Sequence, residues 1–197
     1  NYALCQMGYP KRTIKEVRQF VGNGVAKLIE RAVPDGIREE EVRETLDIFR
    51  AYYSEHCQDK TKPYDGIEKL LLNLREKGIQ SAIVSNKFMG AVKELSRFYF
   101  PEIIKVAIGE QEELGIRKKP APDTVLMALE ELHCKVEDAV YVGDSEVDIQ
   151  TAVNSGMECL TVTWGFRDEN FLLEQGAKYC MRKPCDIIKW IEERARE

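Results

Sequence analysis

The sequence predicts an α/β protein, in which a parallel sheet covered by helices on both faces follows a smaller helical unit. After residue 65, short apolar segments alternate with amphipathic segments of helical spacing, which is typical of a parallel α/β sheet. Before residue 60, apolar residues recur only at helical spacing. A polar segment around Pro63 separates the two parts. We therefore expect two domains, a helical one at residues 1–62 and an α/β one at residues 63–197.

The helical domain is expected to contain short helices with clear breaks. Gly8 and Pro10 indicate that a helix ends near residue 7, because glycine readily takes the left-handed conformation and proline cannot continue a helix. Residues 13–16 (T-I-K-E) form a possible capping box at the start of the next helix. The apolar repeat is interrupted at residues 22–24, resumes as far as the turn at 34–36, and continues in a longer helix from 38 to 56.

In the α/β domain, each predicted strand is a run of apolar residues flanked by helical segments. Such continuous runs are typical of strands that are buried on both faces of a parallel sheet. The predicted strands span residues 81–84, 104–108, 139–142 and 159–162. The predicted helices span residues 67–77, 89–98, 123–132, 147–155 and 186–194.

Composition excludes several classes of function. Acidic residues outnumber basic ones by 34 to 29, which disfavours a nucleic-acid-binding face. No apolar run approaches the roughly 20 residues that a membrane helix requires. The six cysteines form no C-x-x-C motif, and only two histidines could help to bind zinc, so we interpret them as reduced thiols in a cytoplasmic protein.

Polar residues follow the predicted strand at 81–84. Ser85 and Asn86 stand where a serine hydroxyl and backbone N–H groups at a helix start could hold phosphate oxygens. Ser85 could equally cap the next helix.

A second group follows the predicted strand at 139–142. Asp144 and Asp148 are four residues apart, so both carboxylates can face the same crevice if a helix starts between them. Carboxylate oxygens are ligands that Mg²⁺ prefers, together with water and substrate phosphate. The alternative is helix capping, although a third acid, Glu146, makes capping alone a weaker explanation.

A basic loop lies between these two groups. Lys119 precedes Pro120 and Pro122, which stiffen the loop and hold it extended. A lysine held in this way can point into a site and neutralise phosphate charge, although a solvated loop is the simpler interpretation of the residues alone.

In this order, Ser-Asn, Lys-Pro and Gly-Asp-x-x-x-Asp resemble the motifs of the haloacid dehalogenase superfamily, and the resemblance covers the whole chain. Ser85 resembles its second motif, Lys119 its third, and Asp144 with Asp148 its fourth. The helical domain resembles its inserted cap, and the α/β domain its Rossmann-like core. Residues 21–24 (V-G-N-G) and 84–87 (V-S-N-K) are most similar to the phosphoglycolate phosphatase subgroup.

The resemblance implies a Mg²⁺-dependent phosphatase acting on a small phosphorylated metabolite through an aspartyl-phosphate, in a monomer or homodimer. It implies Ser85, Lys119 and Asp148 as catalytic residues. It implies Asp144 as the metal ligand, and Ser85, Asn86 and Lys119 as substrate-binding groups. Residues 22–24 and Lys27 in the cap, and residues 164–167 after a strand, are further candidates for lining the site.

One family motif is absent from these 197 residues. The D-x-D-G-T segment, whose first Asp is the nucleophile and whose second is the general acid/base, does not occur. In the family it lies on a central strand between those that carry Ser85 and Asp144, so without it the sheet would have a gap. We expect this segment to precede Asn1, an expectation that the helix ending near residue 7 without a start signal also supports.

Three alternatives remain at this stage. A haloacid dehalogenase also carries Ser-Asn and Lys-Pro but needs no metal. A phosphomutase would convert a sugar phosphate without net release of phosphate. A non-catalytic α/β module that has lost its nucleophile strand would bind a ligand without turning it over.

Overall fold

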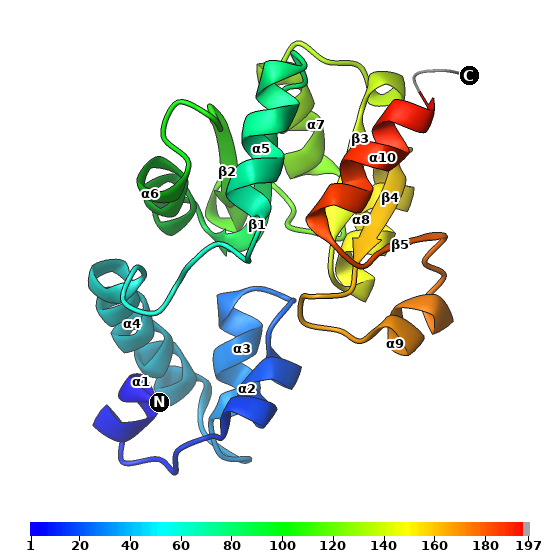
Figure 1. The fold of residues 1–197 in the computed structure, drawn as a ribbon. Coiled ribbons are helices and arrows are strands. Elements are labelled where there is room, and N and C mark those ends of the chain that lie inside the picture. Colours follow the sequence, from blue (N-terminus) through cyan, green and yellow to red (C-terminus); the bar gives the residue numbers. More distant parts are fainter. Residues whose placement is uncertain (195–197) are drawn as a thin grey trace.

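The computed structural model describes residues 1–194 and has the expected α/β class (Figure 1). The helical unit comes first in the chain and lies beside the α/β unit. Its helices are α1 (Tyr2–Gln6), α2 (Ile14–Phe20), α3 (Val25–Ala32) and α4 (Glu39–His56). The α/β unit follows with α5 (Ile67–Glu76), β1 (Ala82–Phe88), α6 (Met89–Tyr99), β2 (Val106–Glu110), η1 (Glu112–Leu114), α7 (Asp123–Glu131), η2 (Val136–Asp138), β3 (Val140–Gly143), α8 (Glu146–Ser155), β4 (Glu158–Val162), α9 (Glu169–Glu174), β5 (Tyr179–Met181) and α10 (Pro184–Arg194).

The helical unit has its own small core. Leu4, Ile29, Ala32 and Val33 are buried together, and they come from α1, α3 and the residue after α3. The predicted capping box is confirmed at the start of α2, where the Glu16 N–H donates to Thr13 Oγ1 at 3.2 Å and the Thr13 N–H donates to Glu16 Oε2 at 2.7 Å.

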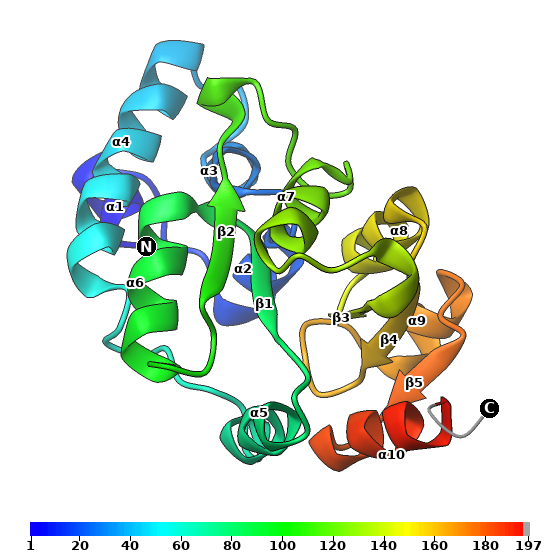
Figure 2. The same cartoon turned by 90° about the horizontal axis from the view of Figure 1, so that it is seen from above.

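All strand pairs are parallel, and they form two sheets with the interruption expected of a sheet that lacks the D-x-D-G-T strand. One sheet pairs β1 with β2, and the other has the order β3-β4-β5. Figure 2 shows β1 and β3 as neighbouring edges between the two sheets. No backbone ladder joins them within residues 1–194, so each edge has backbone groups without a partner strand.

Helices cover both faces of the three-stranded sheet, as predicted. Leu160 of β4 packs with Leu70 of α5 and Ile187 of α10 on one face. On the other face, Tyr141 of β3 packs with Leu129 of α7 and Ala152 of α8. Alternate residues along a strand point to opposite faces, so the neighbours Val140 and Tyr141 of β3 pack against different layers.

The predicted end of the first strand is wrong. β1 does not stop at Val84 but continues to Phe88, with an irregular register against β2 between these two residues. The Ser-Asn motif therefore lies inside the strand rather than in a loop. Two short elements near the C-terminal end, α9 and β5, were not predicted from the sequence.

The described helices include none that is long and apolar enough to cross a membrane.

Candidate active site

A buried ion pair lies at the centre of the candidate site. Lys119 Nζ is 2.8 Å from Asp148 Oδ1, and only 12% and 8% of the two side chains are exposed. Lys119 Nζ also donates to the Tyr141 hydroxyl at 3.1 Å, which in turn donates to Asp148 Oδ1 at 3.2 Å. The triangle gives each of these buried polar groups a partner, as burial requires.

The ion pair determines the protonation of both residues. Burial alone would lower the pKa of Lys119, but the neighbouring Tyr141 and Asp148 outweigh it, so that this pKa is raised. Burial alone would raise the pKa of Asp148, but Lys119 and the Ser145 hydroxyl outweigh it, so that this pKa is lowered. Lys119 is therefore a fixed positive charge and Asp148 a fixed negative one at neutral pH.

Asp148 is held by the start of α8. Its Oδ2 accepts hydrogen bonds from Ser145 Oγ at 2.7 Å and from the Asp144 N–H at 3.1 Å. A Cβ atom at Gly143 would clash with the Asp148 side chain, so glycine is needed for this close approach. Because both Asp148 oxygens are engaged, this residue orients Lys119 and leaves cation binding to another acid.

Asp144 follows the carboxyl end of β3. Its Oδ2 accepts a hydrogen bond from the Phe166 N–H at 3.0 Å, and within residues 1–194 no N–H or hydroxyl donor reaches its other oxygen. Burial raises the pKa of Asp144; the Phe166 N–H opposes this shift, and the negative charge of Asp148 adds to it. A Cβ atom at Gly165 would overlap the Asp144 carboxylate.

Asp144 fits Mg²⁺ as one ligand of a shared coordination sphere. Mg²⁺ is commonly held by one or two carboxylates, with waters and substrate phosphate completing the sphere. Residues 1–194 contain no cluster of three or more acidic, histidine or cysteine side chains that would hold a metal by themselves. Asp144, with one carboxylate oxygen that accepts no hydrogen bond within residues 1–194, matches a site in which one carboxylate shares the cation with water and phosphate.

Glu146, the third acid of the motif, is neutralised by Arg167. The guanidinium binds it through two hydrogen bonds, Nε to Oε2 at 2.9 Å and Nη2 to Oε1 at 3.0 Å. The hydrogen bonds from Arg167 lower the pKa of Glu146 despite its partial burial. Glu146 thus fixes the loop after β4 and does not add a free charge to the crevice.

The side chain of Asn86 holds the backbone of Lys119. Its Oδ1 accepts from the Lys119 N–H at 2.9 Å, and its Nδ2 donates to the Lys119 carbonyl at 2.9 Å. The same Nδ2 donates to the Gly22 carbonyl of the helical unit at 3.1 Å. Lys119 is followed by a cis peptide bond to Pro120. Asn86 thus connects β1, the lysine loop and the helical unit.

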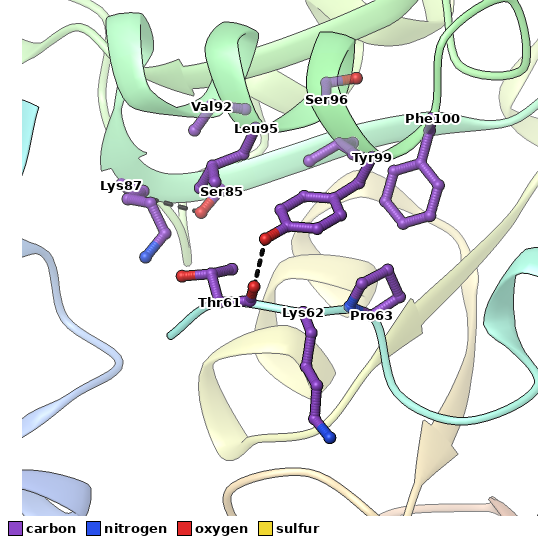
Figure 3. Close-up of a pocket in the computed structure, with 11 residues that line it drawn as sticks. Thr61, Lys62, Pro63, Ser85, Lys87, Val92, Leu95, Ser96, Tyr99 and Phe100 are labelled. Carbon is purple, nitrogen blue, oxygen red and sulfur yellow. Dashed lines mark hydrogen bonds between the residues drawn. The ribbon is translucent and has the colours of Figure 1, made fainter. Parts of the chain in front are cut away.

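Ser85 lines a pocket of about 180 Å³ (Figure 3). The pocket lies between β1, α6 and the segment before α5, and Lys87, Tyr99 and Thr61 also line it. Ser85 Oγ accepts a hydrogen bond from the Lys87 N–H at 3.1 Å, and the Tyr99 hydroxyl donates to the Thr61 carbonyl. Lys87 Nζ donates to the Tyr53 hydroxyl of α4 at 2.9 Å.

The structure joins most of the sequence-derived candidates into one network. Continuous hydrogen bonds connect Asn86, Lys119, Asp148 and Asp144. Ser85 is next to Asn86 in the chain. Within residues 1–194, however, its side chain has no hydrogen bond to any residue of this network.

Sequence reasoning missed three partners in this network. Tyr141 could have been predicted, because alternate residues of a strand share a face and Tyr141 is two residues before Gly143, which precedes Asp144. Ser145 stands three residues before Asp148, a spacing typical of helix N-termini. No sequence pattern predicted the hydrogen bond from the Phe166 N–H, because this loop is more than twenty residues from its acceptor, Asp144, in the chain.

The chain matches known proteins along nearly all of its length. The family model for haloacid dehalogenase-like hydrolases matches residues 1–162. A phosphoglycolate phosphatase from Aquifex aeolicus is 31% identical over 195 residues, which cover 96% of this chain and 85% of that protein. A phosphoglycolate phosphatase from Cereibacter sphaeroides is 34% identical over 175 residues, which cover 85% and 77%.

The fold comparison agrees with the sequence comparison. A solved structure from Lactobacillus delbrueckii subsp. bulgaricus superposes with a TM-score of 0.87 at 36% identity, covering 94% of this chain and 86% of that one. The family match, the relatives and the shared fold lead to the same conclusion: the chain belongs to the haloacid dehalogenase-like hydrolases.

Proposed function

We propose that this hydrolase is a Mg²⁺-dependent phosphatase that acts on a small phosphomonoester of the phosphoglycolate type. The observation that carries the proposal is the buried Lys119–Asp148 pair beside Asp144, whose second carboxylate oxygen has no hydrogen-bond donor within residues 1–194. The names of the relatives from Aquifex aeolicus and Cereibacter sphaeroides support the choice of substrate.

Lys119 provides a positive charge next to the transferring phosphoryl group. Because its pKa is raised by its partners, it stays protonated throughout the reaction and does not act as a base. Asp148 and Tyr141 fix its position, so little reorganisation is needed when negative charge develops on the phosphate oxygens.

Asp144 would hold the cation. Bound Mg²⁺ supplies charge neutralisation at the phosphate. Asp144 must be ionised to serve as a ligand, and the hydrogen bond from the Phe166 N–H holds one of its two oxygens in place. Ser85 and the backbone N–H of Asn86 would hold phosphate oxygens. The helical unit, docked through Gly22 on Asn86, would exclude water from the first step.

The nucleophile is the part of the proposal that these 197 residues do not supply. We propose a strand carrying the D-x-D-G-T motif that pairs between β1 and β3, where the two sheets have neighbouring unpaired edges. Its first Asp attacks phosphorus and forms an aspartyl-phosphate while the P–O bond to the alcohol breaks. The second Asp protonates the departing alcohol and then takes a proton from the water that hydrolyses the aspartyl-phosphate.

We also propose a reducing, cytoplasmic setting. All six cysteines have free thiols, including buried Cys57, and this supports the interpretation from composition.

The test compares Asp144→Asn with Asp138→Asn in the full-length protein. Phosphate release from phosphoglycolate is measured with Mg²⁺ and with EDTA. Asp138 is exposed and lies outside the network, so its variant should keep normal turnover. Asp144→Asn should lose Mg²⁺-dependent turnover while its circular dichroism spectrum stays unchanged, because the amide cannot supply an anionic ligand.

Three results would contradict the proposal. Unchanged turnover in Asp144→Asn would refute the metal role. Halide release without Mg²⁺ would point to a dehalogenase. No phosphate release from any phosphomonoester would point to a phosphomutase or a non-catalytic module, and isomerisation of a sugar phosphate would distinguish these two.

A further inference from the structure

The orientation of the Asp144 carboxylate depends on one peptide group in the loop between β4 and α9. The Phe166 N–H donates to Asp144 Oδ2 at 3.0 Å, and the absence of a side chain at Gly165 allows the carboxylate to come this close. The carbonyl of this same peptide group belongs to Gly165. The peptide is planar and trans, so its C=O and N–H point in opposite directions and turn together.

The opposite end of this peptide group is bound by the helical unit. Arg18, in the last turn of α2, donates from Nη2 to the Gly165 carbonyl at 2.8 Å. Its Nε donates to the Phe166 carbonyl at 2.9 Å. A further hydrogen bond runs in the opposite direction, from Arg167 Nη1 to the Arg18 carbonyl at 3.5 Å. Figure 1 shows the loop after β4 extending toward α2 and α3.

Other contacts between the two units reach different parts of the core. Arg50 of α4 contacts Glu110 at the end of β2 at 4.0 Å and Glu113 of η1 at 3.4 Å. Lys87 contacts Tyr53 on the side of the Ser85 pocket. Among the hydrogen bonds within residues 1–194, those of Arg18 are the ones that connect the helical unit to the peptide group holding Asp144.

We propose that Arg18 is a positioning residue that couples docking of the helical unit to the orientation of the Asp144 carboxylate. When Arg18 binds the Gly165 carbonyl, the peptide plane is fixed and its N–H is aimed at Asp144. A cation on the carbonyl also polarises the peptide and strengthens the N–H as a donor. When the helical unit moves away, the peptide can rotate and the carboxylate loses its fixed direction. The metal role of Asp144 in this inference rests on the proposed function.

The test replaces Arg18 with Met, which keeps a similar apolar stem but donates no hydrogen bond. Arg50→Met is the matched control, because it removes an arginine that also bridges the two units but does not touch the loop. Arg18→Lys keeps the charge and can restore one of the two hydrogen bonds. Amide hydrogen exchange of Phe166 is measured without Mg²⁺, and the Mg²⁺ concentration for half-maximal phosphate release is measured separately.

In Arg18→Met, we expect Phe166 exchange to be about threefold to tenfold faster, the change that one exposed hydrogen bond commonly carries. The half-maximal Mg²⁺ concentration should rise by a similar factor, with a smaller change in the KM for phosphoglycolate. Arg18→Lys should lie between the wild type and Arg18→Met, and Arg50→Met should leave both readouts at wild-type values.

Two outcomes would overturn the inference. One is Phe166 exchange in Arg18→Met that equals that of the wild type or of Arg50→Met. The other is faster exchange with an unchanged Mg²⁺ requirement, which would show that the loop does not act on the metal carboxylate. If the wild-type protein has no Mg²⁺-dependent activity, the proposed function fails, while the exchange experiment still decides whether Arg18 controls the peptide group.

Discussion

Lys119 is the residue on which the charge balance of the site depends. Replacing it with Ala should lower kcat by about 10²-fold or more, the usual cost of removing a group that stabilises developing charge. Lys118→Ala is the matched control, because Lys118 is the adjacent lysine and pairs with Glu112 outside the network. Steady-state kinetics at saturating Mg²⁺ measures both variants. A near-normal kcat for Lys119→Ala would place this residue outside the site.

Asp148 should make stability depend on pH on the acid side. Its pKa is lowered in the folded protein, so its contribution is fully present above the unfolded pKa of about 4 and is lost as pH falls through the folded value. The raised pKa of Lys119 acts in the opposite direction, and its contribution is lost only as pH rises through the folded value, above about 10.

Asp148→Asn isolates this contribution. At pH 7 the variant leaves the Lys119 charge buried without its partner, which should lower the free energy of unfolding by about 3–5 kcal/mol. The difference from the wild type should shrink between pH 5 and pH 2, roughly, as the wild-type carboxylate takes up a proton. Urea denaturation across this range is the measurement, and a difference that stays constant with pH would contradict the ionic interpretation.

At the scale of elements, the extension of β1 to Phe88 places Asn86 where it can hold the lysine loop. Asn86→Ala should lower the free energy of unfolding by about 2 kcal/mol or more, because it leaves the buried N–H and carbonyl of Lys119 without partners. Asn154→Ala is the control, because Asn154 makes one exposed hydrogen bond to the Pro120 carbonyl of the same loop. Equal losses of unfolding free energy in the two variants, measured by urea denaturation, would argue that Asn86 does not hold the lysine loop in place.

Elements with a strong local signal could be predicted from the sequence. The capping box at Thr13 and the alternation of apolar runs with helices both depend on neighbouring residues, and both are confirmed. The length of β1 could not be predicted, because pairing with β2 is interrupted at the polar residues Ser85, Asn86 and Lys87 and resumes only at Phe88, opposite Glu110. A low intrinsic strand propensity is weak evidence against a strand when pairing with a neighbouring strand determines the structure.

In the candidate site, too, some contacts could be predicted from the sequence and others depend on tertiary structure. The meeting of Lys119 with Asp148 could be anticipated from the resemblance to the family motifs, although the residues of the loop alone favoured a solvated lysine. The pairing of Glu146 with Arg167 could not, because no periodicity links a helix start to a loop that follows the next strand. Such contacts depend on tertiary structure, which local sequence patterns do not encode.

At the scale of the whole molecule, the helical unit has a core separate from those of the α/β unit. Both tryptophans, Trp164 and Trp190, belong to the α/β unit, whereas Leu4 and Ile29 pack only within the helical unit. The helical unit should therefore unfold at lower urea concentration, because its apolar cluster is small and most of its hydrogen bonds to the α/β unit are exposed.

Two probes of the same urea titration test this expectation. Circular dichroism at 222 nm should begin to change before tryptophan fluorescence does. Coincident transitions for the two probes would instead indicate that the units unfold as one cooperative body.

Gly143 and Gly165 allow the backbone at the end of β3 and after β4 to approach the two acids closely. Each presents bare backbone to a carboxylate, Gly143 to Asp148 and Gly165 to Asp144. A methyl group at either position would overlap the neighbouring carboxylate and displace it. Alanine at Gly143 would therefore disturb the acid that orients Lys119, whereas alanine at Gly165 would disturb the acid proposed to hold the cation. Two substitutions of one added methyl group each can thus separate the charge on the lysine from the binding of the metal.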